Sequence, residues 1–291
     1  MRETRAEGAD HHPMAGVDHF TPGEIARLVE TKGVTKAEAG TLVTLVLGVV
    51  AGAFIALGGL LSTTVSTGST LGVGPTRLLA GASFSLGLIL VVIGGAELFT
   101  GNNLIVMSFV TGRVSAARLL RNWGLVYAGN LVGALSVVAM VFVGEWWSLA
   151  EHEMGATALT VAAGKAALPF GVAFVRGILA NALVCLAVWL ASAGRTVIDK
   201  VVAIVFPITG FVAAGFEHSV ANMYFLPLGL LLSEEPEVVA AAELPSAQLA
   251  ALDVPGMLTN IVAATLGNIV GGAVLVGLVY WFVYLRPARS R

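Results

Sequence analysis

The sequence predicts an all-α membrane protein with six transmembrane helices, arranged as an inverted 3+3 repeat with two broken helices. Its composition is the first reason: 57% of the 291 residues are hydrophobic and only 12% are charged, whereas soluble domains carry about 25% charge. The second reason is a series of apolar runs, each long enough for the roughly 20 residues that a spanning helix needs. These six runs cover about 39–66, 78–112, 122–144, 161–193, 201–232 and 257–285.

A short amphipathic helix is expected before the first run. A capping box at Thr21–Glu24, with Pro22 at the first helical position, marks its start. Gly33 can end it, and a second capping box, Thr35–Glu38, is expected to open the first spanning helix. The chain therefore divides into an N-terminal tail, a six-helix transport domain and a C-terminal tail, at 1–35, 36–285 and 286–291.

Two of the runs contain polar interruptions. The run 78–112 holds "GAELFTGNN", and the run 201–232 holds "GFEHSVAN". Non-helical backbone at membrane depth occurs only where it is buried in protein or lines a cavity. Each run is therefore predicted to be a discontinuous helix, made of two half-helices joined by a polar link.

The two interruptions also reveal an internal repeat. Glycine, glutamate and asparagine recur in them 120 residues apart, and the same offset pairs Ala53 and Phe54 with Ala173 and Phe174. "GNLVGA" in the third run resembles "GNIVGG" in the sixth, at a slightly larger offset. Each half holds three spans, which is an odd number. The second half must therefore have the opposite orientation in the membrane. Broken helices in matching positions of inverted repeats indicate a transport site.

The basic residues predict the orientation. Thirteen of the sixteen Lys and Arg fall on one side of the predicted spans, and the loops on the other side are acidic. By the positive-inside rule both termini are expected in the cytoplasm. The thirteen are Arg2, Arg5, Arg27, Lys32, Lys36, Arg113, Arg118, Arg121, Arg195, Lys200, Arg286, Arg289 and Arg291.

Other function classes find little support in the sequence. The formal net charge is −2, which gives no reason to expect a nucleic-acid partner. The single cysteine, Cys185, allows neither an internal disulfide nor a CxxC metal site. No HExxH, GxSxG, Walker or GxGxxG motif is present. We therefore expect no enzyme activity and no cofactor.

Three segments resemble signatures of the formate/nitrite transporter family: "GGAELFTG" (94–101), "GILANALVCLAVW" (177–189) and "GFEHSVANM" (215–223). The resemblance covers the chain from about residue 36 to 285. It implies an aquaporin-like fold and a homopentamer with one pore per subunit, in a bacterial-type inner membrane. It also implies passage of a small monovalent anion: formate, nitrite or hydrosulfide.

His218 is the candidate central residue, because it is the only histidine inside an apolar run. Ionisable residues within membrane spans are rare and usually functional, although a neutral histidine packed in the core is the alternative. It matches the family's central pore histidine. An imidazole has an unperturbed pKa of roughly 6.5 and can exchange a proton under physiological conditions, so His218 can give a proton to a weak-acid anion.

The resemblance implies roles for other residues. Thr100 is expected to face His218 and hydrogen-bond it, and Asn181 and Asn222 are expected near the pore, although either amide could equally join two helices. Lys165 is expected to attract anions to the outer vestibule or simply to extend its ammonium to the interface. We favour a structural role for the repeat-related pair Glu97 and Glu217, each accepting backbone N–H groups of its broken helix. No role is predicted for Arg176. The expected apolar constrictions on either side of the histidine are Phe84, Leu88, Leu98 and Phe211.

The predicted function is a channel or transporter for small monovalent anions, with formate as the first choice and proton-coupled passage through His218. Nitrite or hydrosulfide is the alternative within the family. A neutral-solute channel is a weaker rival, because the paired Asn-Pro-Ala turns of aquaporins are absent and the corresponding link reads "SVAN". A membrane-embedded enzyme using Glu217 and His218 would need a third catalytic or metal-binding group at depth, which the sequence does not offer.

Overall fold

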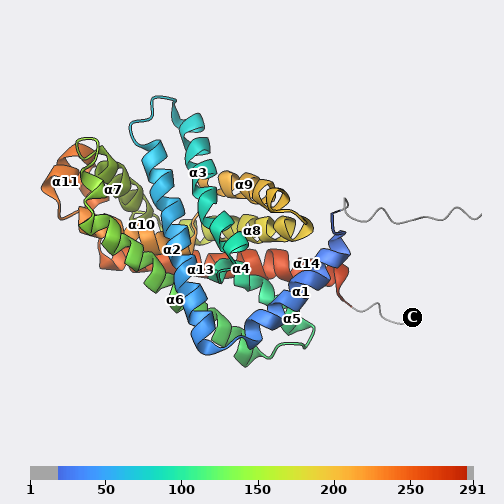
Figure 1. Cartoon of the computed structure of the whole chain (residues 1–291). Helices are drawn as coiled ribbons and strands as arrows, with labels where there is room; N and C mark the ends of the chain where they lie inside the picture. Colours follow the sequence, from blue (N-terminus) through green and yellow to red (C-terminus); the bar gives the residue numbers. More distant parts are fainter. Residues whose placement is uncertain (1–18, 287–291) are drawn as a thin grey trace, which may run out of the picture.

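A computed structural model describes residues 19–286, and these form helices joined by short links (Figure 1). The parts of the predicted tails at 1–18 and 287–291 lie outside the described residues. The α-helices are α1 (Pro22–Glu38), α2 (Thr41–Ser66), α3 (Val73–Gly94), α4 (Phe99–Asn102), α5 (Val106–Val110), α6 (Ala116–Val143), α7 (Glu153–Ala166), α8 (Phe170–Ala193), α9 (Val197–Ala213), α10 (Ser219–Leu232), α11 (Pro236–Ala242), α12 (Ser246–Ala250), α13 (Val254–Ile269) and α14 (Val279–Tyr284). Short 3₁₀ turns, η1 (Asn103–Ile105) and η2 (Trp146–Ser148), and a π-helix, η3 (Val270–Leu278), complete the described chain.

Six membrane-spanning segments confirm the predicted fold class. Five stretches are long and apolar enough to cross a membrane: α2, α3, α6, α8 and the continuous α13–η3–α14. The sixth span combines α9 and α10, which have 17 and 14 residues and are each too short alone. The predicted break in the second run is also present, because α3 is followed by the short helices α4 and α5.

Both broken segments turn at a glycine with the same backbone conformation. Gly95 has φ +77° after α3, and Gly215 has φ +73° after α9. A side chain at such a positive φ is strained, whereas glycine adopts it without cost from a Cβ. The two links then run through Glu97 and Glu217 to the starts of α4 and α10. Glycine therefore recurs at these two positions because each link begins with a positive φ angle.

Two predicted boundaries are wrong. The first helix does not end at Gly33 but continues to Glu38, and the Thr35 hydroxyl donates to the carbonyl of Thr31 instead of capping a new helix. Gly33 lies where α1 crosses α5, so closely that a Cβ there would collide with Ser108. The fourth run is also divided, since α7 ends at Ala166 and α8 begins after Pro169, which cannot supply the backbone N–H of a continuous helix.

Glycines let the first and third spans of each repeat cross at close range. A Cβ on Gly133 of α6 would meet the carbonyl oxygen of Val49 in α2, and one on Gly271 would meet that of Ile178 in α8. Val49 and Ile178 make equivalent contacts, so the repeat offset between the first and fourth runs is 129 residues. The offset of 120 predicted from Ala53 and Ala173 is wrong for this pair of spans. Close approach at small residues is the usual way in which membrane helices associate.

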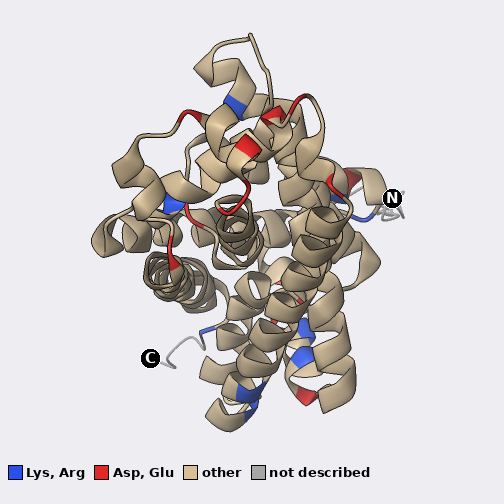
Figure 2. Cartoon of the chain, turned by 90° about the vertical axis from the view of Figure 1, so that its left-hand side faces the viewer, with Lys and Arg blue, Asp and Glu red and all other residues tan. Residues whose placement is uncertain are grey.

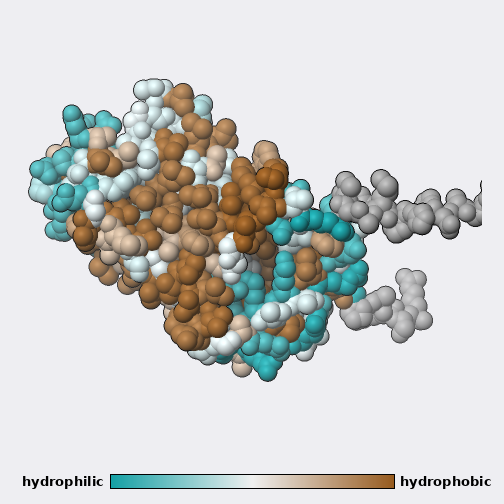
Figure 3. All heavy atoms as spheres, viewed as in Figure 1, coloured by the Kyte–Doolittle hydropathy of each residue, from teal (hydrophilic) through white to brown (hydrophobic). Residues whose placement is uncertain are grey.

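The surface has the polarity of a membrane protein. Figure 3 shows apolar side chains covering the middle of one face, with hydrophilic ones near α11 at one end and near α1 and α5 at the other. Large apolar residues on α2 and α6, such as Val43, Val132 and Met140, are more than half exposed. Figure 2 shows the acidic residues gathered towards one end of the molecule and most basic residues towards the other.

Candidate functional site

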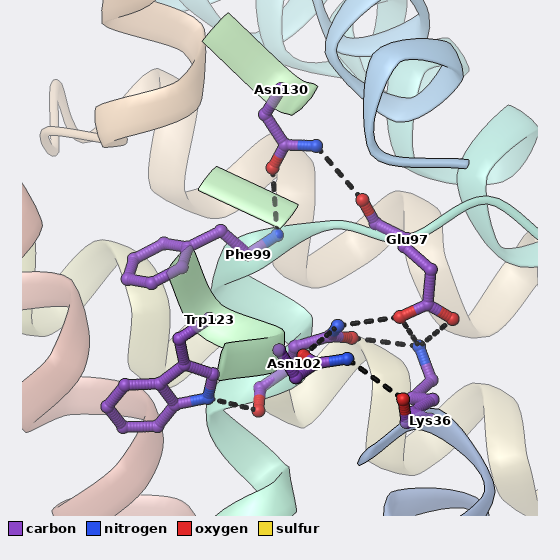
Figure 4. A network of polar contacts seen from close by, with 7 residues as sticks. Lys36, Glu97, Phe99, Asn102, Trp123 and Asn130 are labelled. Atoms are coloured by element: carbon purple, nitrogen blue, oxygen red, sulfur yellow. Dashed lines mark hydrogen bonds and ion pairs between the residues drawn. The ribbon is translucent and has the colours of Figure 1, made fainter. Parts of the chain in front are cut away.

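A partly buried polar network holds the first broken helix in place (Figure 4). Lys36 of α1 donates to Glu97 at 3.1 Å and to the Asn102 Oδ1 at 2.8 Å. Asn102 Nδ2 donates to Glu97 at 2.6 Å and to Asn122 at 2.9 Å, and Asn122 donates back to the Lys36 carbonyl at 3.0 Å. The network therefore ties α1 and α6 to the first link, and the Lys36 ammonium meets both Glu97 oxygens and one amide oxygen.

The second broken helix has the same arrangement. Lys165 of α7 donates to Glu217 at 3.0 Å, and Asn222 Nδ2 donates to Glu217 at 2.7 Å and to Asn260 at 2.7 Å. Asn260 donates to the Lys165 carbonyl at 2.9 Å. Each residue has a partner of the same type in the first network, so the inverted repeat extends to side-chain chemistry. The contacts of the lysine and of the amides differ: Lys165 meets one Glu217 oxygen, and the Asn222 Oδ1 has no hydrogen-bond partner among the described residues. Asn260 also donates to Glu217, at 3.2 Å.

Asparagines, rather than glutamates, bind the backbone of the links. Asn130 accepts the N–H of Phe99 at 2.9 Å and donates to the carbonyl of Glu97 at 2.9 Å (Figure 4). Asn268 makes the equivalent bonds to Ser219 and Glu217, each at 2.9 Å. The prediction that the two glutamate carboxylates accept these backbone N–H groups is therefore wrong. The carboxylates bind lysine and asparagine side chains instead.

His218 lies at the start of α10, in the non-helical link. Its side chain is buried, its Nε2 lies 2.9 Å from the Thr100 Oγ1, and its Nδ1 accepts the backbone N–H of Ala221 at 3.1 Å. The Phe211 ring is stacked on the imidazole with centroids 5.9 Å apart. The structure thus brings Thr100 and His218, 118 residues apart in sequence, into direct contact between the two broken helices.

Two cavities lie on either side of this pair. The large cavity, about 760 Å³, is lined by His218, Phe84 and Phe211 and by Lys165 of α7. The small cavity, about 270 Å³, is lined by Leu88 and Leu98 together with Lys32 and Lys36 of α1 and Lys200 of α9. Phe84 and Phe211 meet edge to face at 5.6 Å. The four predicted constriction residues therefore separate into one pair for each cavity.

The remaining predicted site residues lie behind the cavity walls. Asn181 is buried and donates to the carbonyls of Thr100 at 3.3 Å and Asn268 at 2.6 Å. Asn222 belongs to the second network. Neither amide lines the large or the small cavity, so both hold the link segments from behind. Arg176, for which no role is predicted from the sequence, lines the large cavity.

Sequence reasoning missed several residues of the networks. Lys36 entered only the prediction of orientation, and Asn122 and Asn260 had no predicted role. Asn130 and Asn268 are the asparagines of "GNLVGA" and "GNIVGG", so their signal was available. An amide that recurs in matching spans needs a partner in lipid, and the broken helix of the same repeat is the nearest source of unpaired backbone groups.

The fold and the site together define a class: a polytopic membrane protein with an inverted repeat and a buried histidine between two cavities. The chain belongs to the formate/nitrite transporter family, which matches residues 23–282. It is 41% identical over 273 residues to the formate channel FocA of Escherichia coli K12, covering 92% of this chain and 96% of that protein. It is 38% identical over 288 residues to a probable formate transporter of Methanothermobacter thermautotrophicus, covering 93% and 99%.

Solved structures give the same result. A pentameric formate channel with formate bound is similar with a TM-score of 0.78 and 38% identity, over 84% of this chain and 98% of that chain. An ion channel of the same family is similar with a TM-score of 0.75 and 29% identity, over 89% and 98%. These relatives are named as channels and transporters rather than enzymes, as expected from the sequence.

Proposed function

We propose that this protein is a formate channel in which His218 couples the passage of the anion to a proton. The observation that carries the proposal is the buried Thr100–His218 pair, which lies between two cavities that each hold a lysine and an apolar constriction. The relatives named as formate channels support formate as the substrate. Nitrite and hydrosulfide remain the alternatives within the family.

The hydrogen bonds at His218 define which proton can move. Its Nδ1 accepts from Ala221, so in the neutral ring the Nε2 carries the hydrogen and donates it to the Thr100 Oγ1. The Thr100 hydroxyl hydrogen is then free to bind an anion. A second ring proton must sit on Nδ1 and displace the Ala221 N–H. The charged ring therefore loses a helix cap, which is regained only when the hydrogen on Nδ1 leaves again.

The proposed passage has three steps. Lys165 and the other basic groups of the large cavity concentrate the anion. At the constriction, the charged ring passes its Nε2 proton to Thr100 while the Thr100 hydroxyl proton moves to the anion, leaving a neutral acid and a neutral ring. The neutral acid then crosses between Leu88 and Leu98, where an ion would be strongly disfavoured because desolvation is costly. The ring is then neutral with its hydrogen on Nδ1. Nε2 takes a proton from water and Nδ1 releases its hydrogen to water, which restores the Nε2–H tautomer and the bond from the Ala221 N–H.

The orientation and assembly are part of the same proposal. The chain is proposed to span the bacterial-type inner membrane with both termini in the cytoplasm, which places the small cavity inside and the large cavity outside. A homopentamer is proposed because a similar solved structure is pentameric. Lipid and neighbouring subunits would then cover the exposed apolar residues of the outer helix faces.

Flux in proteoliposomes tests the proton-coupled mechanism. An inward formate gradient should alkalinise the vesicle exterior in proportion to formate uptake, because one proton crosses with each anion. His218→Asn should abolish this proton movement, and Thr100→Val should reduce it at least tenfold. Phe109→Leu, on the exposed surface of α5, serves as the control. Proton movement that persists unchanged in His218→Asn would refute the relay.

A substrate panel in the same vesicles tests the choice of anion. Formate, nitrite and hydrosulfide are compared at equal gradients, with glycerol and water as neutral solutes. Formate is expected to cross fastest. If nitrite or hydrosulfide crosses faster than formate, that anion is the preferred substrate. If glycerol crosses and formate does not, the protein is not an anion channel.

A further inference from the structure

The basic residues that lie outside the predicted positive side share one location. Sixteen Lys and Arg minus the thirteen on that side leave Arg77, Lys165 and Arg176. All three line the large cavity, although they come from α3, α7 and α8. Glu153 is the only acidic residue among the described residues that line it. The cavity therefore carries an excess of positive charge at the acidic end of the molecule.

The two guanidinium groups have hydrogen-bond donors to spare. Among residues 19–286, neither Arg77 nor Arg176 has a carboxylate within 4.0 Å, and neither side chain donates a hydrogen bond. Lys165 meets one oxygen of Glu217, whereas Lys36 meets two carboxylate oxygens and an amide. A guanidinium offers a planar fork of donors that matches an oxyanion, so these arginines are free to bind one.

Both arginines adjoin the link that leads to His218. The Arg77 guanidinium lies against the α-carbon of Gly215, where a Cβ would collide with it. The Arg176 carbonyl accepts the N–H of Glu217 at 3.4 Å. An anion bound by these side chains would therefore lie at the mouth of the histidine site and compete with an anion moving towards it.

The rest of the large cavity suits an apolar body. Phe84, Phe211, Phe216 and Phe225 line it, and its volume of about 760 Å³ far exceeds that of an anion as small as formate. The small cavity differs in both respects. It measures about 270 Å³, and its basic residues are lysines. The residue equivalent to Arg176 in the first repeat is Leu47, whose carbonyl accepts the N–H of Glu97 at 3.1 Å.

We infer that the large cavity is a binding site for monovalent oxyanions that carry an apolar body, such as aromatic carboxylates and sulfonates. Arg77 and Arg176 bind the oxyanion, and the phenylalanine rings pack on the body. The body is too bulky to pass between Phe84 and Phe211, so the ligand blocks the pore from this side only. The blocking effect rests on the proposed function, whereas the binding itself does not.

Binding and flux are measured separately with benzenesulfonate, a strong acid that does not cross lipid as a neutral species. Calorimetric titration of the purified full-length protein should show one site per chain. Arg176→Leu and Arg77→Gln should each weaken binding at least fivefold, and Arg176→Lys should weaken it less. Arg118→Gln, which removes an exposed arginine paired with Glu38, should leave binding unchanged.

Formate flux is then measured in vesicles of known orientation, with benzenesulfonate on one face at a time. Inhibition is expected only from the face of the large cavity, and it should weaken in Arg176→Leu in step with binding. Equal binding by unaltered, Arg176→Leu and Arg77→Gln proteins would overturn the site, as would equal inhibition from both faces. If formate does not cross in the unaltered protein while benzenesulfonate still binds, the proposed function fails and the binding site stands.

Discussion

At the scale of single residues, the two glutamates show how the protein holds carboxylates close to the buried histidine site. Glu97 and Glu217 each face a lysine at 3.0–3.1 Å and accept from an asparagine. Their charge is therefore compensated at close range, and no net negative charge faces the cavities. Removing one partner of a buried pair is strongly unfavourable, because the other charge is left without compensation.

The two networks respond differently to loss of the carboxylate charge. In Glu97→Gln, Lys36 keeps Asn102 as an acceptor and remains about one-third exposed. In Glu217→Gln, Lys165 loses its only anionic partner among the described residues, at a more buried position. We expect Glu217→Gln to cost about 2–3 kcal/mol and Glu97→Gln about 1 kcal/mol.

The difference is measured as the fall in Tm of the two purified variants in one detergent at neutral pH. Asn260→Asp serves as a charge-restoring second change in the Glu217→Gln background, since Asn260 lies 3.2 Å from the same carboxylate. Partial recovery of Tm is expected. Equal losses in the two single variants would show that the unpaired lysine does not set the cost.

At the scale of secondary-structure elements, close crossing of the spans depends on the absence of side chains at a few positions. Gly133 of α6 faces the Val49 carbonyl of α2 without space for a Cβ. A Cβ on Gly124 of the same helix would meet no heavy atom within 4 Å among the described residues. The two glycines therefore separate the cost of a steric clash from the intrinsic preference of alanine for helix.

Gly133→Ala should push α2 and α6 apart and lower the stability by about 1–3 kcal/mol, the range for overpacking in a filled core. Gly124→Ala should be neutral or slightly stabilising, because alanine is the better helix former. Thermal unfolding in detergent measures both. A loss in Gly124→Ala as large as that in Gly133→Ala would contradict the close-crossing explanation.

The position of α1 brings three lysines together around the small cavity. Burial, followed by the positive charges of Lys200 and Lys36, lowers the pKa of Lys32 below its ordinary value. The charged form is therefore less favourable in the folded state than in the unfolded state. This destabilisation is present at pH values below the folded pKa and is relieved as the pH rises through it.

Lys32→Met should raise the Tm at pH 7 by about 1–3 °C, which corresponds to a fraction of a kcal/mol. The variant should also show a smaller gain in Tm between about pH 7 and about pH 10 than the unaltered protein, because that window approaches the ordinary lysine pKa. Arg27→Gln, an exposed change on the same helix, should keep the original pH dependence. An unchanged pH profile in Lys32→Met would show that like-charge repulsion at α1 is negligible.

At the scale of the whole molecule, the two inverted halves meet at the buried histidine and contribute different residues to this site. The second half provides His218 and the first provides Thr100. The N-terminal helix closes one end of this arrangement, because Ile25, Ala26 and Val29 are buried against the membrane domain. It is therefore a structural part of the domain as well as a wall of the small cavity.

Two truncations separate these roles of α1. A protein that begins at residue 19 keeps every contact among the described residues and serves as the reference. Deleting residues 1–34 removes Ile25 and Val29 and should cost about 3–6 kcal/mol, since burying each such side chain contributes about 1.5–3 kcal/mol. Formate flux against pH is then compared for the stable form. A 1–34 deletion with the Tm of the reference would show that the buried contacts of Ile25 and Val29 contribute little to stability.

The sequence by itself determined that the chain has membrane spans and two broken helices, and it singled out His218 as an ionisable residue within one of them. Hydropathy and rare polar residues in lipid are strong local signals. It also contained the repeat between the breaks. The fourth run was predicted as one span, although Pro169 separates α7 from α8. The repeat offset of the first spans was wrong, because one alignment of two apolar segments differs little from another. Local patterns also predicted an end at Gly33, where the glycine serves a helix crossing.

The tertiary structure decided which polar groups pair and which face a cavity. Nothing local to Glu97 or Glu217 shows that each meets a lysine from another helix, or that Asn130 and Asn268 bind the broken backbone. The same holds for Arg77, Lys165 and Arg176, which are scattered in sequence and line one cavity. Burial and backbone breaks follow from neighbouring residues, whereas pairing across spans depends on how the two halves pack.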